Sequence, residues 1–264
     1  MDGFASAAPP WDQWWGGLGW SWIEVASSEY IESMLMTRFN KLLSALPSQC
    51  TVCHTWPAES ICEDCIDRFG QPLPRCRTCA MPVPDHMEQC GACLAEPPLL
   101  DRCLAAVSYG YPWSGVIGRY KFREQPGLAD ALALLVRSVP WVEPVLEAAD
   151  VVLPMPLSTH RLQHRGFNQA LLLARQLAPS KTDSSLLVRI KDTPPQSSLK
   201  RAERLASVTH AFKVDPQRRA AVRNARLVLI DDVMTSGASL FSAAHALRRA
   251  GAAHVCAIVI ARTE

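Results

Sequence analysis

The 264-residue sequence lacks any apolar run of the roughly 18 residues that a membrane-crossing helix needs. Its first residues also lack the basic stretch followed by an apolar stretch that marks a secretory signal. There is little excess charge, since 27 Lys and Arg stand against 25 Asp and Glu, so net charge implies no polyelectrolyte partner. We therefore expect a globular cytoplasmic protein that does not insert into membranes.

Residues 1–36 lack Lys and Arg altogether and carry five acidic residues. This stretch also holds five of the eight tryptophans among glycines, with no helical or strand period. Three interpretations stay open for it. It is a disordered tail, a segment that binds a partner, or a stretch outside the native product, because Met34 and Met36 offer later start sites.

Cysteine is scarce except in one segment, which holds eight of the ten cysteines in four CxxC units. The units are Cys50 with Cys53, Cys62 with Cys65, Cys76 with Cys79, and Cys90 with Cys93. Each unit presents two thiolates from a tight turn, and two units complete a tetrahedral zinc site. Neighbouring units would make two zinc ribbons in tandem, while a cross-braced pairing stays open. A disulfide framework is the alternative, and the lack of a secretory signal argues against it.

We predict that two structural Zn²⁺ ions hold a small module over residues 37–98. Four thiolates leave no coordination position for water, so these sites would serve structure and not catalysis. The segment is rich in proline and poor in large apolar residues, so metal removal should unfold residues 45–98 and leave the rest folded. Six acidic residues against three arginines between Cys50 and Cys93 make the module anionic, and hence a poor nucleic-acid binder by itself.

From residue 99 onward, apolar runs alternate with helical patterns. This alternation predicts an α/β domain over residues 99–264, with a mainly parallel sheet flanked by helices. The predicted strands are 103–111, 151–154, 186–190, 226–231 and 254–261. The predicted helices are 113–122, 128–139, 165–177 and 237–250. The two remaining cysteines, Cys103 and Cys256, lie in the strand segments and are expected in the core.

The strongest single motif spans residues 227–240. Four apolar residues lead into Asp231 and Asp232, and a loop of small residues then opens a helix. The loop residues are Thr235, Ser236, Gly237, Ala238 and Ser239. Free N–H groups at a helix start bind phosphate, and two carboxylates at the carboxyl end of a buried strand suit ribose hydroxyls or Mg²⁺. We expect both carboxylates to face the ligand because the chain leaves the strand there; the alternative is a plain strand-to-helix turn with an Asp cap.

This motif resembles the phosphoribosyl pyrophosphate (PRPP) binding motif of type I phosphoribosyltransferases. Further blocks occur in the order typical of the ComF family, which comprises competence-associated, phosphoribosyltransferase-like proteins with an N-terminal zinc module. These blocks are Tyr120-Lys121-Phe122, Leu153-Pro-Met-Pro-Leu157, Arg161, Arg165-Gly-Phe-Asn-Gln169, and a block from Arg189 to Phe212. The sequence departs from the family pattern at Ser207, where Asn is usual, and at Ser236, where Thr is common.

The resemblance implies a type I phosphoribosyltransferase-like fold, binding of PRPP with Mg²⁺, and a link to competence and DNA uptake. It assigns the 5′-phosphate to the loop of residues 235–239 and the ribose hydroxyls to the two aspartates. Lys121 is a candidate for the pyrophosphate, together with two arginines, and Arg204 for a mobile loop that closes over it. Catalysis would use Mg²⁺ and cations in place of a protein nucleophile. The candidate catalytic residues are Asp231, Asp232, Arg161 and Arg165.

Three functions stay open. The first is an enzyme that transfers the phosphoribosyl group to an acceptor that the sequence does not identify. The second is a protein that responds to PRPP without catalysis, in contact with other proteins of the competence machinery. The third is a factor that handles single-stranded DNA through residues 189–226, where ten Lys and Arg stand against three acids. DNA and PRPP would then compete for one cationic surface, although PRPP alone explains the same charge excess.

Overall fold

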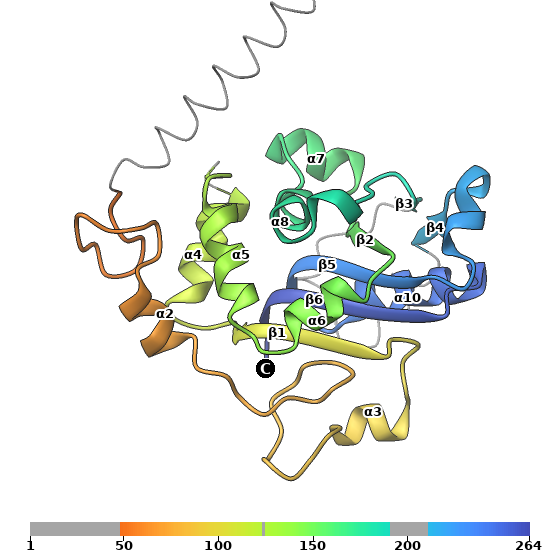
Figure 1. Ribbon diagram of the computed structural model, residues 1–264, viewed down its shortest axis with the longest axis horizontal. Coiled ribbons are helices and arrows are strands. Elements are labelled where there is room, and N and C mark those ends of the chain that lie inside the picture. Colours follow the sequence, from red (N-terminus) through yellow and green to blue (C-terminus); the bar gives the residue numbers. More distant parts are fainter. Residues whose placement is uncertain (1–47, 123–124, 191–210) are drawn as a thin grey trace, which may run out of the picture. The chain divides into compact units, whose positions relative to one another are not determined.

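Four parallel strands form the centre of the computed structural model, in the order β1-β6-β5-β2 (Figure 1). The strands are β1 Arg102–Ser108, β2 Val151–Pro154, β5 Arg226–Met234 and β6 His254–Arg262. In the middle strand β6, all residues after His254 are buried, as expected for a strand that is covered on both faces. The predicted α/β class, with a parallel sheet flanked by helices, is confirmed.

The structure describes residues 48–122, 125–190 and 211–264. Within these ranges, Gln49–Glu264 form one compact unit. The predictions for the tail, for residues 37–47, for Arg204 and for most of the block between Arg189 and Phe212 lie outside the described residues. The predicted boundary at residue 98 stays a prediction about independent folding.

Helices cover both faces of the sheet. The helices are α2 Glu63–Phe69, α3 Gly91–Ala95, α4 Trp113–Phe122, α5 Leu128–Arg137, α6 Val142–Glu147, α7 Thr159–Arg165, α8 Gln169–Leu177, α10 Ala238–Ala250 and the 3₁₀ turns η1 Pro179–Lys181 and η3 Pro216–Val222. Among the described helices, none is both long and apolar enough to cross a membrane. A separate antiparallel pair joins β3 Leu187–Arg189 to β4 Phe212–Val214.

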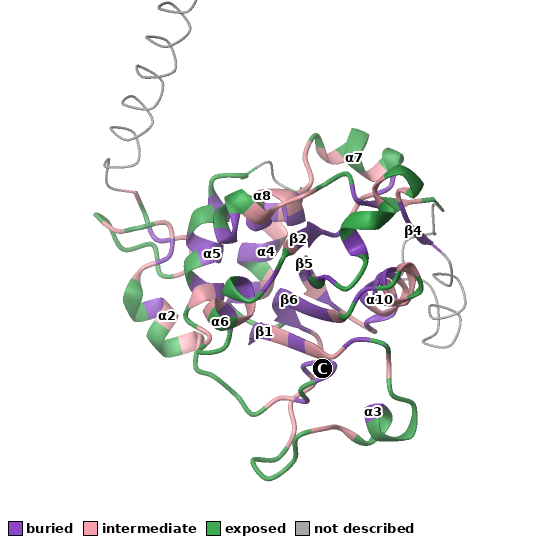
Figure 2. Cartoon of the chain, turned by 45° about the vertical axis from the view of Figure 1, so that its right-hand side comes forward, coloured by how far each residue is buried: buried purple, intermediate pink, exposed green. Residues whose placement is uncertain are grey.

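Successive side chains of the central strands pack into two different hydrophobic cores. In β5, Val228 and Ile230 pack into a first core with α4, α5 and α8. Leu227 and Leu229 pack into a second core with α10. This alternation follows from the period of two along a strand, and Figure 2 shows the buried strands between the helical layers. Cys103 and Cys256 are 2% and 3% exposed, so both lie in the core as predicted.

The cysteine-rich segment packs against both cores. Ile61 and Cys65 belong to the first core, and the indole Nε1 of Trp113 in α4 donates to the Phe69 carbonyl at 2.8 Å. Cys79 and its neighbour Ala80 belong to the second core. The segment therefore shares its apolar contacts with the sheet and its helices, and has no core of its own in the described residues.

The predicted helix over residues 165–177 is wrong at its start, because the structure divides this region into α7 and α8. Gly166 ends α7 with a φ of 76°, a left-handed conformation that glycine adopts without strain. Asn168 then begins α8, since its side-chain oxygen accepts from the N–H groups of Ala170 at 2.9 Å and Leu171 at 3.3 Å. The predicted strand 226–231 is too short, because β5 continues to Met234.

The shared packing changes what metal removal should do. We expect a chelator to lower the melting temperature of the whole unit 49–264 in a single transition, in place of unfolding residues 45–98 alone. Metal analysis of protein purified without added zinc should first give about two Zn²⁺ per chain. Circular dichroism melting and amide hydrogen exchange, before and after chelation, then measure the effect.

Zinc added back after chelation provides the control and should restore the original melting curve. Faster exchange confined to the cysteine segment, with α4, α5 and β6 still protected, would contradict the shared core. A natively folded protein that contains almost no metal would overturn both parts of the prediction.

Candidate functional site

The eight CxxC cysteines form two clusters in the structure. The first cluster is Cys50, Cys53, Cys62 and Cys65, and the second is Cys76, Cys79, Cys90 and Cys93; within each, the sulfur atoms lie within 4.8 Å of one another. The predicted pairing of the first unit with the second, and of the third with the fourth, is therefore what the structure shows. The cross-braced alternative is wrong.

The sulfur spacing fits a tetrahedral metal. The Sγ atoms of Cys79 and Cys90 are 3.6 Å apart, and those of Cys50 and Cys65 are 3.9 Å apart. Four Zn–S bonds of about 2.3 Å place tetrahedral sulfurs about 3.8 Å from one another, whereas a disulfide bond measures about 2.05 Å. Either cluster could therefore hold Zn²⁺.

Backbone N–H groups also stabilise the thiolate form of Cys50. Burial raises the pKa of Cys50, but N–H groups of Cys53, Cys62 and Val52 lower it, and the net direction is down. The N–H groups of Val52 and Cys62 each donate to the Cys50 Sγ at 3.4 Å. These bonds favour the thiolate, which is the form that binds metal.

A second candidate site lies at the carboxyl edge of the sheet. Strand β2 ends at Pro154, which pairs with Ile230 of β5, so the next residues of β5 extend past their neighbour. These residues are Asp231 and Asp232. The expectation that the chain leaves the strand there is wrong, because both acids lie within β5, which continues to Met234.

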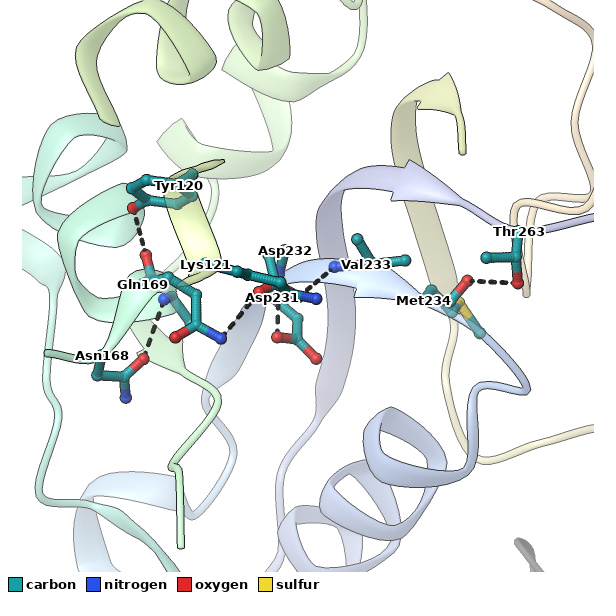
Figure 3. A network of polar contacts seen from close by, with 10 residues as sticks. Tyr120, Lys121, Asn168, Gln169, Asp231, Asp232, Val233, Met234 and Thr263 are labelled. Atoms are coloured by element: carbon teal, nitrogen blue, oxygen red, sulfur yellow. Dashed lines mark hydrogen bonds and ion pairs between the residues drawn. The ribbon is translucent and has the colours of Figure 1, made fainter. Parts of the chain in front are cut away.

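Asp232 is held in a buried polar network (Figure 3). It is 3% exposed, and its Oδ1 lies 2.8 Å from the Nζ of Lys121 at the end of α4. Its Oδ2 accepts from the Gln169 Nε2 at 2.8 Å, and the Gln169 carbonyl accepts from the Tyr120 hydroxyl at 2.7 Å. The network therefore fixes α4, α8 and β5 to one another.

Gln169 is a site residue for which the sequence analysis gave no role. It is 3% exposed, and within the described residues its Oε1 is buried without a hydrogen-bond partner. An amide oxygen in this state favours a ligand hydroxyl, because an unpaired buried acceptor costs about 1–3 kcal/mol. The Arg-Gly-Phe-Asn-Gln block that ends at Gln169 was the available signal.

Asp231 has a strongly perturbed acidity. Burial and the charge of Asp232 raise its pKa to about 7, although Lys121 and Arg165 act in the opposite direction. Its Oδ1 accepts from the Asp232 N–H at 2.9 Å. Two adjacent carboxylates therefore hold only part of their full charge near neutral pH, and a cation beside them would favour full ionisation.

Arg165 of the short helix α7 lies near the acid pair. The guanidinium carbon of Arg165 is 4.9 Å from the centre of the Phe122 ring. Burial lowers the pKa of Arg165, while the charges of Asp232 and Asp231 raise it and that of Arg161 lowers it further. Arg165 is therefore within electrostatic reach of both aspartates and of Arg161, and the binding of an anion by the two arginines stays a prediction.

The loop after β5 leads into the start of α10 through a glycine with a positive φ. Gly237 has a φ of 80°, and a Cβ there would lie 2.5 Å from the Met234 Cε, so only glycine fits. It precedes α10 and supplies no side-chain cap to the helix, whose positive end faces the loop. A hollow of about 40 Å³ lies here, far below the size of whole-nucleotide pockets. Its lining includes Asp231, Thr235, Gly237, Ala238 and Ser239.

The structure thus brings most of the predicted PRPP residues to one edge of the sheet. Lys121 is paired with Asp232 in this structure, and its predicted contact with pyrophosphate stays a prediction. Ser236 lies in the loop, where its Oγ accepts from the Ala238 N–H at 3.4 Å. Arg204 lies outside the described residues.

Comparisons with known proteins add relatives of similar length. No family model matches this chain. DNA utilization protein YhgH of Salmonella typhimurium is 31% identical over 227 residues, which cover 83% of this chain and 98% of the relative. Competence protein F of Haemophilus influenzae is 29% identical over 198 residues, covering 72% and 85%. Competence protein ComFC of Bacillus subtilis is 28% identical over 215 residues, covering 78% and 86%.

One solved structure, described as the allosteric regulatory enzyme of purine biosynthesis, aligns with 54% of this chain and 29% of its own. The identity is 19% and the TM-score is 0.32. We draw nothing from a likeness this low.

The raised pKa of Asp231 predicts how stability depends on pH. An unfolded aspartate has a pKa of about 3.9, so the folded state binds the proton more tightly and loses stability as pH rises from about 4 to about 7. Asp231→Asn removes this cost. We expect its advantage in unfolding free energy over wild type to grow by about 2 kcal/mol between pH 5.5 and pH 8.

Urea denaturation at the two pH values measures the effect, and a range above pH 5.5 keeps the metal thiolates from protonation. Asp130→Asn, on the exposed face of α5, is the matched control and should show no such growth. Equal pH dependence of wild type and Asp231→Asn would show that Asp231 ionises normally.

Proposed function

Because this chain belongs to the ComF family, with DNA utilization protein YhgH among its relatives, we propose that it binds PRPP with Mg²⁺ at the carboxyl edge of the sheet. The observation that carries the proposal is the loop of residues 235–239, which joins an acid pair to the start of α10. The positive φ of Gly237 lets the chain turn directly from β5 into α10, so the N–H groups at the helix start lie next to the acid pair. The 40 Å³ hollow matches a phosphoryl group in size.

The 5′-phosphate would bind at the loop, where N–H groups and hydroxyls gather at the positive end of α10. The ribose hydroxyls would donate to Asp231, whose proton leaves when a cation or a hydroxyl donor stabilises the carboxylate. Gln169 Oε1 offers a further acceptor for a hydroxyl. Asp232 would act mainly by holding Lys121 and Gln169 in place.

The acid pair also fits Mg²⁺. Asp231 carries carboxylate oxygens, the ligands that this ion prefers, and the mutual repulsion that raises its pKa would be relieved by a divalent cation. Bound Mg²⁺ would neutralise charge on the pyrophosphate. Arg161 and Arg165 would bind the pyrophosphate from α7, and their charge would stabilise it as a leaving group if an acceptor displaces it.

The binding test uses Asp231→Asn, which should fold at least as well as wild type. We expect its affinity for PRPP–Mg²⁺ to be weaker by about 10- to 150-fold, because it loses a charge-assisted hydrogen bond worth about 1.5–3 kcal/mol. Titration calorimetry measures both proteins, with Asp130→Asn as the control. Asp232→Asn should also bind more weakly, since it releases Lys121 and Gln169 together.

Equal affinities of wild type and both variants would mean that the acid pair does not contact the ligand. Turnover is a separate question. Incubation of wild type with PRPP, Mg²⁺ and a panel of purine and pyrimidine bases, with release of pyrophosphate as the readout, separates an enzyme from a protein that binds PRPP without catalysis.

Single-stranded DNA is the second candidate ligand. The names of the relatives point to DNA utilization and competence. The observation that favours it here is a surface groove of about 450 Å³ between β4 and α10, which has four basic side chains and no acidic one in its described lining. The basic residues are Lys213, Arg219, His245 and Arg249. We propose that this groove contributes to a cationic surface that binds single strands.

The DNA test is fluorescence anisotropy of a labelled oligonucleotide. Lys213→Glu with Arg249→Glu should weaken binding by about tenfold or more, and the log–log salt slope of wild type should be roughly −0.7 per phosphate neutralised. Arg68→Glu with Arg175→Glu makes the same change of charge on exposed helix faces elsewhere and is the control. PRPP–Mg²⁺ at fixed ionic strength should compete if the two ligands share cations. Unchanged affinity of the groove variant would place DNA binding elsewhere.

A further inference from the structure

Arg262, the last residue of β6, lies between the second cysteine cluster and the candidate phosphate loop. Arg262 is 3% exposed. The Nε donates to the Cys79 carbonyl at 2.8 Å, and the Nη1 donates to the Met234 carbonyl at 3.1 Å and to the Thr235 carbonyl. One side chain therefore bonds to a metal-cluster residue and to the residue that opens the loop.

These bonds are geometrically demanding. A guanidinium is always charged, and burying it costs several kcal/mol unless acceptors are correctly placed. In the described residues, its hydrogen bonds go to backbone carbonyls and to the Thr263 carbonyl and hydroxyl. A backbone carbonyl moves only when its segment moves. The position of Arg262 therefore depends on the conformation of both segments that it joins.

Met234, the last residue of β5, is held in place by several contacts. The Met234 carbonyl also accepts from the Thr263 N–H at 3.0 Å, and Figure 3 shows the Thr263 hydroxyl directed to the same oxygen. The Met234 sulfur lies 3.5 Å from the Cys103 Sγ in the second core. Its methyl group fills the space that a Cβ on Gly237 would need. A shift of Met234 would therefore change the shape of the loop.

We propose that Arg262 couples metal binding at the second cysteine cluster to the conformation of the loop of residues 235–239. Metal at Cys76 and Cys79 fixes the turn between them and thus the Cys79 carbonyl. Arg262 transmits this position to the Met234 and Thr235 carbonyls, so the loop is held ready for a phosphate. The coupling to ligand affinity rests on the proposed PRPP function, while the coupling to loop conformation does not.

The first cysteine cluster gives a matched comparison within the same chain. Its contacts go to α4, where the Arg119 guanidinium donates to the Thr51 carbonyl at 3.1 Å, and its buried cysteines belong to the first core. Loss of metal there should disturb α4. Loss of metal at the second cluster should disturb the loop.

The experiment uses the full chain and three variants. Cys90→Ser removes a ligand of the second cluster, Cys53→Ser removes one of the first, and Arg262→Lys keeps the charge but loses the fork of donors. Hydrogen exchange of the amides of residues 235–241 reads the loop without any ligand. Metal analysis counts the remaining zinc, and calorimetry measures affinity for PRPP–Mg²⁺.

We expect faster loop exchange in Cys90→Ser and Arg262→Lys, and exchange as in wild type in Cys53→Ser. Arg262→Lys should keep both metals and still bind PRPP–Mg²⁺ about tenfold more weakly, because the loop conformation that is competent to bind becomes about tenfold less populated. The double variant Arg262→Lys with Cys90→Ser should lose no more than the worse single variant, since both break one path.

Loop exchange equal to wild type in Arg262→Lys, additive losses in the double variant, or equal loop effects of Cys53→Ser and Cys90→Ser would each overturn the coupling. If Arg262→Lys does not fold, the comparison of the two cysteine variants decides. A wild type that binds no PRPP, but whose loop responds to metal at the second cluster alone, would refute the proposed function and support the coupling.

Discussion

The ion pair of Lys121 and Asp232 is the contact on which the candidate site depends. A carboxylate that is 3% exposed is costly to bury, and the pair offsets that cost only while the Lys121 ammonium stays 2.8 Å away. This requirement fixes the end of α4 against β5, and Gln169 adds the start of α8. Burial and the neighbouring carboxylate of Asp232 together raise the pKa of Asp231. The buried pair and its hydrogen bond to Gln169 therefore join α4, α8 and β5 beside Asp231.

The site illustrates a conflict between stability and binding. A neighbouring like charge and burial both disfavour an ionised Asp231, so the fold would be more stable without it. The same features prepare the carboxylate for a cation or a sugar hydroxyl. Strain of this kind is common at binding sites, where the ligand recovers free energy that the empty protein lacks. The arrangement is therefore easier to explain by binding than by folding.

The sequence predicted the parts of this protein that have a local signature. The CxxC spacing fixes two Cys₄ clusters, and apolar runs in β2, β5 and β6 predict a parallel sheet. The limits of β5 could not be read from the pattern, because the strand continues through charged residues that a tertiary ion pair neutralises. The division between α7 and α8 had a signal in Gly166 and Asn168 that helical periodicity concealed. Arg262 had none, since the partners by which it joins the two segments are the Cys79, Met234 and Thr235 carbonyls, which are distant from it in the chain.

The two cysteine clusters support opposite sides of one site, and they differ in access. Asp232 contacts α4 and α8, which pack into the first core, whereas Asp231 lines the hollow at the start of α10, which packs into the second. Cys53 of the first cluster is exposed, whereas three of the four cysteines in the second are buried. Oxidants in solution would therefore reach the first cluster sooner. Loss of metal there would disturb α4 and Lys121 before the loop of residues 235–239, so oxidative damage would begin on the α4 side of the candidate site.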